Sequence, residues 1–401
     1  MEKPTADYVG LVAESEHADD SFLFPSVPLT DFDGGGLADH RLVTASVDWH
    51  KPPPSHAIDP HGNRLEGTLG TGDRRTHAKV LASLTEATLN WSHCAVTRNE
   101  FHCFFSATGR EWAEDVARAN PDHPWKMSTG LCMTERGLAI RRDKWISRKV
   151  VENRVLLGSA DEPSNWGLYL VNTLQAAIYF NNNRDRYDKF LCFAPSPNYV
   201  NLLAMVGVAE SDIVFHDVFE TYELAHLDMF KHTFRDLYIA PEELAHYRIL
   251  SNAVLGQFSA GPRLVYLSRQ ERQKRYGPYR ALMNEEDLAT QLERRGFSIV
   301  NPEFLNPVEQ VQVMAGADII VGLGGAGMFN TVFCRTGAQV LDIESTPLFV
   351  EAHTNLFASA ELDYALLLGL EDETDETASH RRWTVDVDAV LAVVDTWLAS
   401  P

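Results

Sequence analysis

The segment from Arg263 to Ile343 alternates short apolar runs with amphipathic helical patterns. Short runs without polar alternation suit strands that are buried on both faces, and such strands belong to parallel sheets. Parallel neighbours need a crossover connection, which the intervening helical patterns supply. The segment therefore predicts a Rossmann-like lobe. Its expected strands are Arg263–Leu267, Phe297–Val300, Ala317–Val321 and Gln339–Ile343.

Local signals place the helices between these strands. Asn284 is a plausible N-cap because acidic residues follow it, and Gly296 ends that helix. Asn306 precedes Pro307 and Glu309, which is the spacing of a capping box. A final amphipathic helix, Asp388 to Leu398, is expected to dock on this lobe.

Helical and strand patterns also alternate upstream, between residues 165 and 215. We therefore expect an α/β fold with two lobes, each containing parallel βαβ units. The N-terminal lobe is predicted over residues 1–258, of which 1–150 are irregular and strand-rich and 151–258 are α/β. The C-terminal lobe is predicted over 259–401. A long helix from Pro241 to Phe258, with proline in its first turn, is expected to connect the two.

Composition excludes several classes of protein. The net charge of −21 disfavours nucleic-acid binding, which needs a basic surface, and also docking on anionic lipid. The five cysteines form no Cys-x-x-Cys pair, so we expect reduced thiols rather than disulfides or a zinc cluster. No signal-peptide pattern and no long apolar run are visible. A cytoplasmic location without membrane insertion is therefore expected.

The most specific local motif is the glycine-rich turn from Gly322 to Gly327, which lies between an apolar strand and a helix. Small residues let backbone N–H groups approach a diphosphate, and the helix N-terminus adds partial positive charge. The alternative is a tight turn that binds nothing. The turn is not a P-loop, because no Gly-Lys-Ser/Thr follows, and its spacing differs from the dinucleotide fingerprint.

A basic segment follows the first strand of this lobe. Ser268 and Arg269 come directly after the strand, and Arg272 and Arg280 lie further on. The carboxyl ends of parallel strands face the ligand crevice, where arginine can bind a phosphate through paired hydrogen bonds. A solvated basic loop is the alternative interpretation.

These motifs occur together and in order, and the chain resembles glycosyltransferase family 61, which includes capsular polysaccharide enzymes. A weaker resemblance covers Asn165 to Gly207. The matching stretch, Leu264 to Ile343, contains Ser268-Arg269, Arg280, Asn284-Glu285, Gly296-Phe297, Glu309-Gln310, Ala317 to Gly322, Gly325-Ala326-Gly327, Asn330 and Phe333.

The resemblance implies a GT-B type fold, which consists of two Rossmann-like lobes with the donor in the cleft between them. It also implies inverting transfer from a nucleotide sugar, usually UDP-linked, to a glycan acceptor without an obligatory metal. Asn165 and Asn172 are the implied acceptor-side residues. The implied donor-binding residues are Ser268, Arg269, Arg280, Asn284, Glu285, Glu309, Gly324, Gly325, Ala326, Gly327 and Asn330.

Three positions depart from the family pattern. Leu168, Asn172 and Gly324 stand where the family carries histidine or an acid. Inverting transfer needs a base for the acceptor proton, and none of these three is a good one. The remaining candidate bases are Asp161, Glu162, Tyr169 and Glu309. Glu309 is equally well explained as a helix cap, and Tyr169 as a core residue.

Three functions therefore compete: an active glycosyltransferase, a degenerate relative that binds a nucleotide sugar or a partner without transfer, and an NAD-type oxidoreductase. The third is the weakest, because the ribose-binding acid is missing. No metal is expected, since the donor lobe shows no clustered carboxylates. The Asp-x-Asp patterns at 31–33 and 386–388 are interpreted as surface turns.

Overall fold

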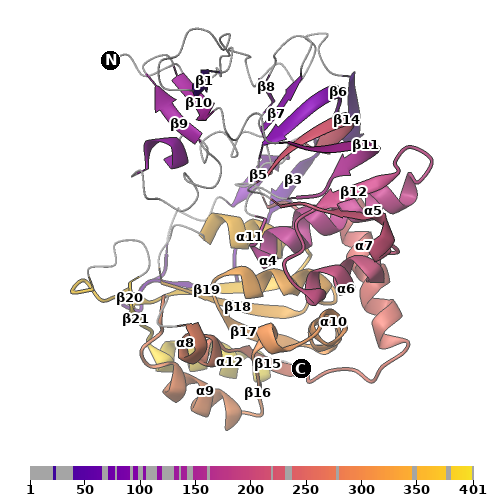
Figure 1. Ribbon diagram of the computed structural model, residues 1–401. Coiled ribbons are helices and arrows are strands. Elements are labelled where there is room, and N and C mark those ends of the chain that lie inside the picture. Colours follow the sequence, from indigo (N-terminus) through magenta and orange to yellow (C-terminus); the bar gives the residue numbers. More distant parts are fainter. Residues whose placement is uncertain are drawn as a thin grey trace. The chain divides into compact units, whose positions relative to one another are not determined.

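The computed structural model shows an α/β protein with mixed and parallel sheets (Figure 1). The α/β class predicted from the sequence is confirmed. The structure describes residues 21–23, 39–65, 71–76, 79–90, 94–97, 103–104, 115–119, 131–134, 137–141, 148–159, 163–217, 220–230, 237–276, 280–345, 350–375 and 381–399.

The chain forms two compact units. Unit 1 consists of Met1–Val47 and His77–Phe234, and unit 2 of Asp48–Thr76 and Arg235–Pro401. This division differs from the boundary expected at residues 258 and 259, because helix α7 (Pro241–Leu255) belongs to unit 2. There the ring of Tyr247 packs edge-on against Phe333, and Ser251 Oγ donates to the Phe333 carbonyl at 2.8 Å.

Unit 1 contains a mixed sheet in the order β13, β12, β11, β14, β6, β7, β8, with β2 also paired to β6. The pairs β11–β12, β12–β13 and β11–β14 are parallel, and the remaining pairs are antiparallel. The bounds are β2 Asp39–Thr44, β6 Lys79–Asn90, β7 Cys94–Thr97, β8 Cys103–Phe104, β11 Arg148–Leu157, β12 Lys189–Cys192, β13 Ile213–Phe215 and β14 Thr221–Phe230.

A small antiparallel sheet and several helices complete the described part of unit 1. The single helix expected over Asn165–Phe180 is divided by a π-helical turn, η3. The bounds are β1 Ser21–Leu23, β9 Leu131–Thr134, β10 Gly137–Arg141, α4 Trp166–Leu168, η3 Tyr169–Thr173, α5 Leu174–Asn182, α6 Pro197–Met205 and η4 Glu210–Asp212.

Unit 2 contains a parallel sheet in the order β16, β15, β17, β18, β19, β4. Every strand predicted in the C-terminal lobe is present within a residue or two, because buried parallel strands carry continuous apolar runs. The bounds are β15 Leu264–Leu267, β16 Ser298–Val300, β17 Ile319–Leu323, β18 Gln339–Glu344, β19 Asp363–Leu368 and β4 Ala57–Ile58.

Helices cover this sheet, and α12 packs on it through Val390, Val394 and Trp397, as the amphipathic pattern predicted. Asp386 caps α12 by accepting from the Ala389 N–H at 3.1 Å, whereas residues 31–33 lie outside the described residues. The bounds are α8 Gln270–Tyr276, α9 Glu285–Glu293, η5 Pro302–Phe304, α10 Pro307–Gly316, η6 Ala326–Phe333, α11 Val350–Ser359, α12 Val387–Leu398, and a hairpin of β20 Leu370–Glu371 with β21 Trp383–Thr384.

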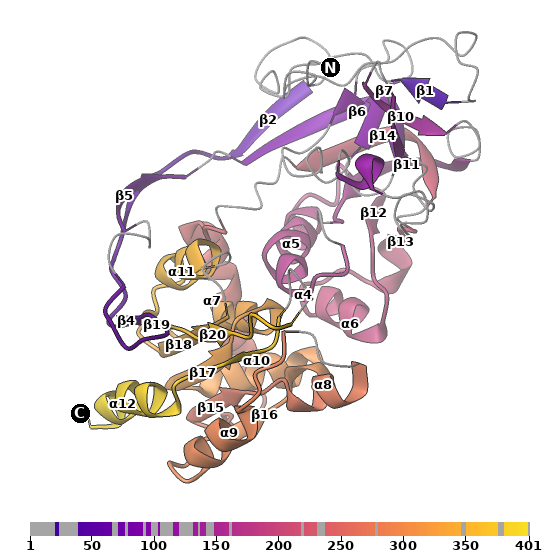
Figure 2. The same cartoon turned by 90° about the vertical axis from the view of Figure 1, so that its left-hand side faces the viewer.

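The segment Asp48–Thr76 was expected in the N-terminal lobe but belongs to unit 2. Its strands β3 (Asp48–Lys51) and β5 (Gly72–Arg75) pair with each other, and β4 extends the parallel sheet beside β19 (Figure 2). Lys51 is fully buried and donates from Nζ to Thr354 Oγ1 at 2.7 Å. The Tyr364 hydroxyl donates to the Pro52 carbonyl at 2.6 Å. Contacts between distant parts of the sequence thus hold this segment on unit 2.

Among the helices that the structure describes, none combines the length and the apolar character needed to cross a bilayer.

Candidate functional site

The strand order of unit 2 creates a switch point between β15 and β17. The chain runs from β15 to β16 on one side, and then to β17 on the other side of β15. In open parallel sheets, ligands bind beyond the carboxyl ends of the strands at such a point. Ser268 and Arg269 follow β15 there, and Gly324 and Gly325 follow β17.

Glu285 fixes the turn after β15. Its Oε1 accepts from the Arg269 backbone N–H at 2.7 Å and from the Ser268 hydroxyl at 2.8 Å. The Tyr266 hydroxyl donates to the same oxygen at 3.3 Å, and the Gln273 amide donates to Oε2 at 3.3 Å. Burial raises the pKa of Glu285, although these donors favour its ionised form. Ser268 and Glu285, both predicted to bind a ligand, therefore hold the turn that carries Arg269.

Arg269 reaches from this turn to the end of β17. Its Nη1 donates to the Gly324 carbonyl at 3.2 Å, and the side chain is half-buried. Burial, together with the positive charges of Arg280 and Arg272, lowers the pKa of Arg269 to about 10. Arg272 and Arg280 thus add positive charge near Arg269, and the acids Glu285 and Glu344 oppose it with a smaller effect, so the net charge favours an anion.

The glycine turn lies against Arg269. Gly325 has φ +146° and ψ −172°, a conformation that residues with a side chain rarely adopt. A Cβ at this position would lie 3.6 Å from Arg269 Nη1. The helix that follows, η6, is a 3₁₀-helix that begins at Ala326. The first hydrogen bond of this helix is the one that the Met328 N–H donates to the Gly325 carbonyl at 2.9 Å. The backbone N–H groups of Ala326 and Gly327 come before it in the chain, at the helix N-terminus, where N–H groups have no partner within the helix.

Asn330 lies inside this helix rather than in the glycine turn that precedes it. It is buried, and its Nδ2 donates to the Gly327 carbonyl at 3.0 Å. We therefore interpret Asn330 as a residue that stabilises the turn.

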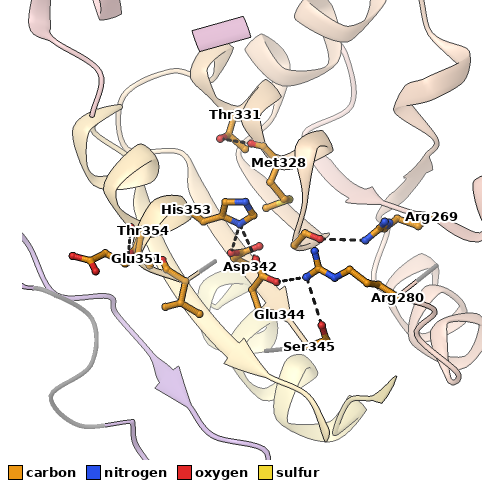
Figure 3. Close-up of polar contacts among 12 residues, drawn as sticks. Arg269, Arg280, Met328, Thr331, Asp342, Glu344, Ser345, Glu351, His353 and Thr354 are labelled. Carbon is orange, nitrogen blue, oxygen red and sulfur yellow. Dashed lines mark hydrogen bonds and ion pairs between the residues drawn. The ribbon is translucent and has the colours of Figure 1, made fainter. Parts of the chain in front are cut away.

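Arg280 takes part in a buried network that the sequence analysis missed. Its Nη2 donates to Glu344 Oε2 at 2.8 Å and lies 3.5 Å from Ser345 Oγ. Glu344 Oε1 lies 2.9 Å from His353 Nδ1, which is 3.0 Å from Asp342 Oδ2 (Figure 3). Asp342 and Glu344 alternate with Leu341 and Ile343 along β18. Two acids spaced two residues apart in an otherwise apolar strand were the signal available in the sequence.

His353 is the second cation of this network. Burial by itself would lower the pKa of His353, but the charges of Asp342 and Glu344 outweigh burial and raise it to about 10. Burial also raises the pKa of Asp342, to about 6, against the opposing effect of His353. The two carboxylates therefore favour the protonated form of His353.

Gly324 leaves the space that Glu344 occupies. A Cβ built on Gly324 would lie 2.0 Å from Glu344 Cδ and 2.1 Å from Oε1. A histidine at position 324, which the resemblance to glycosyltransferase family 61 implies, does not fit beside this carboxylate. The glycine at position 324 is therefore required by the buried carboxylate of Glu344 on β18, which fills the space that a side chain would need.

The same network includes a group with metal-ligand chemistry. Asp342, Glu344 and His353 each place one potential ligand atom within 4.8 Å of the others, all of them buried. The expectation that the donor lobe has no clustered carboxylates is therefore wrong. However, Arg280 and protonated His353 balance the two carboxylates, so the charges are satisfied without an ion. We interpret the group as an ion-pair network.

Two further residues that were predicted to bind the donor, Asn284 and Glu309, lie just before a helix or in its first turn. Asn284 precedes α9 but makes no capping bond; its Nδ2 donates to the Val385 carbonyl at 2.7 Å and its Oδ1 accepts from the Val385 N–H at 3.2 Å. Glu309 is exposed and forms the predicted capping box with Asn306, through hydrogen bonds of 2.8 and 3.1 Å. Helix capping accounts for Glu309 without a catalytic role.

The unit 1 candidates are also accounted for by the local structure. Asn165 caps α4, accepting from the Gly167 N–H at 2.9 Å, and Leu168 is buried. Tyr169 is buried between Trp166 and Tyr199, and burial raises its pKa far above the usual range. Such a tyrosine is a poor base at neutral pH. Asn172 is half-buried in η3, whereas residues 161 and 162 lie outside the described residues.

Residues 166–341 match the family model described as glycosyltransferase 61. The resemblance drawn from the sequence motifs is therefore confirmed over a segment that covers less than half of the chain. This segment contains both the turn after β15 and the glycine turn after β17, and it supports a glycosyltransferase in general terms. A search of curated proteins finds no match.

Proposed function

We propose that this protein is an inverting glycosyltransferase that moves a sugar from a nucleotide-sugar donor to a hydroxyl group of a glycan. The observation that carries the proposal is the contact between Arg269 and the glycine turn at the switch point of unit 2. Both lie in the segment that matches the glycosyltransferase 61 model.

In this proposal the donor diphosphate lies beyond the ends of β15 and β17. Arg269 offers a planar set of N–H donors, and Ala326 and Gly327 offer backbone N–H groups at the start of η6. These groups stabilise the negative charge that the diphosphate gains as its bond to the sugar breaks. The acceptor hydroxyl attacks the anomeric carbon from the opposite face and loses its proton to a base.

The finer features of the proposal follow from the family resemblance. They are a UDP-linked donor, a polysaccharide acceptor, a GT-B arrangement of the two units, and action in the cytoplasm without a divalent metal. Asn165 and Asn172 belong to the acceptor side in this proposal.

A second candidate is a protein that binds a nucleotide sugar without transferring it. It is favoured by the state of two candidate bases. Tyr169 is buried and its pKa is raised, and Glu309 forms a hydrogen bond in a helix cap. Leu168 and Gly324 supply no titratable group. In this reading the diphosphate site persists and turnover is absent. No contact in the described residues favours the NAD-type oxidoreductase.

A panel of UDP-, GDP- and CMP-linked sugars, measured by thermal shift and calorimetry, tests the proposal. Binding that is lost in Arg269→Ala but retained in Arg335→Ala, an exposed arginine paired with Asp318, supports the site. Product analysis with glycan acceptors then separates the two candidates: a transferred sugar identifies an enzyme, and binding without product favours the binding-only protein. Absence of binding by every donor would refute both.

A further inference from the structure

Three costly features of unit 2 meet at Arg280. The residue has φ +49°, a left-handed conformation that is uncommon for a residue with a side chain. Its side chain is only 10% exposed and forms an ion pair with the completely buried Glu344. Gly324 must lack a side chain for Glu344 to lie there. Strained and desolvated groups of this kind concentrate at functional sites.

The network is also an expensive way to fill a core. Its acids, Asp342 and Glu344, alternate with the buried apolar residues Leu341 and Ile343 along β18. Well-packed apolar side chains would stabilise this strand at least as well as a buried ion network. The stability of the sheet by itself therefore does not explain these charges.

Electrostatics explains why Arg280 needs such support. Arg280 and Arg272 both lie close enough to lower the pKa of Arg269, so these like charges repel one another. Glu344 provides the opposite charge that holds Arg280 near Arg269, while His353 occupies the other carboxylate oxygen. Figure 3 shows Arg280 between Glu344 and Arg269. Protonated His353 fixes Glu344 from its other oxygen and offsets part of its negative charge, so more of the positive charge of Arg280 is left for a ligand.

We propose that Glu344 and His353 are positioning residues that hold Arg280 beside Arg269, so that the two guanidinium groups together bind the second phosphate of the donor. The inference rests on the proposed function and adds to it the residues that select a diphosphate. Both positioning residues lie beyond the segment that matches the glycosyltransferase 61 model, which ends at residue 341.

The test compares the affinities of UDP and UMP, measured by calorimetry on the full chain. Glu344→Gln and His353→Gln keep the approximate size of each side chain and remove its charge. Each variant is expected to weaken UDP binding by about 10-fold or more while changing UMP binding less than about threefold. The control for lost stability is Val394→Ala. This substitution leaves a cavity where α12 packs on the sheet, and position 394 is distant in the sequence from both positioning residues.

The outcomes separate the two proposals. If the wild type binds UDP and Arg269→Ala does not, but both positioning variants keep the wild-type ratio of UDP to UMP affinity, the positioning role is refuted and the proposed function stands. The same holds if the ratio falls equally in Val394→Ala. If the wild type binds neither UDP nor UMP, and none of the nucleotide sugars in the donor panel, the proposed function fails and the positioning role fails with it.

Discussion

Replacing Gly324 with alanine tests the steric coupling between β17 and β18. The added Cβ would lie 2.0 Å from Glu344 Cδ, and ordinary contact begins near 3.4 Å, so the carboxylate must move by about 1.4 Å. That movement breaks its 2.8 Å contact with Arg280 and its 2.9 Å contact with His353. Breaking a buried ion pair costs about 3–5 kcal/mol, and we expect Gly324→Ala to lower the free energy of unfolding by about 3 kcal/mol.

A double-mutant cycle isolates the effect. Glu344→Ala alone should also cost about 3–5 kcal/mol, because it leaves two buried cations with less opposing charge. The double variant Gly324→Ala/Glu344→Ala should cost about the same as Glu344→Ala, since the new methyl group then has room. The free energies come from urea unfolding followed by tryptophan fluorescence. Costs that add within about 0.5 kcal/mol would show that the two residues do not touch.

Gly327→Ala is the matched control in the same turn. The nearest atom to its new Cβ is Pro302 Cγ at 3.6 Å, which is ordinary contact. We expect a change in the free energy of unfolding below about 1 kcal/mol. A loss as large as that of Gly324→Ala would mean that the turn resists any side chain, whatever Glu344 does.

Three further predictions concern the same lobe. Arg269→Ala should weaken nucleotide-sugar binding by about 1.5–3 kcal/mol, the range for a hydrogen bond to a charged group, and unchanged affinity by calorimetry would contradict the site. Gly325→Val should abolish binding, whereas Gly337→Val, at an exposed glycine with φ +74°, should lose stability but keep binding. Because the pKa of His353 is raised from 6.5 to about 10, its proton stabilises the fold fully below pH 6.5, and that contribution disappears as pH rises through 10. The wild type should therefore lose its stability advantage over His353→Gln between pH 7 and 10, and a constant difference in urea midpoint would refute the charge assignment.

The elements of unit 2 were predictable because their causes are local. A strand buried on both faces is apolar throughout, and the capping box of Asn306 and Glu309 lies within one helical turn. The meeting of Arg269 with the glycine turn also followed from the sequence. Both come directly after strands of one parallel sheet, and the carboxyl ends of such strands share an edge.

Other features depended on which distant side chains the fold brings together. The predicted cap Asn284 binds the backbone of Val385, about a hundred residues away, because α12 packs beside α9. Helix α7 and the segment Asp48–Thr76 belong to unit 2 because their packing partners are there, and hydrophobic periodicity does not name a partner.

The sequence by itself determined the order of strands and helices, the glycine turn and the position of Arg269, since each is set by residues close together in the chain. Only the tertiary structure decided what surrounds Arg280. Glu344 approaches because Gly324 leaves space, and His353 arrives from α11 to balance the charge. The free energy of a buried charge depends on all the neighbours that replace its water, and those neighbours come together only when the chain has folded.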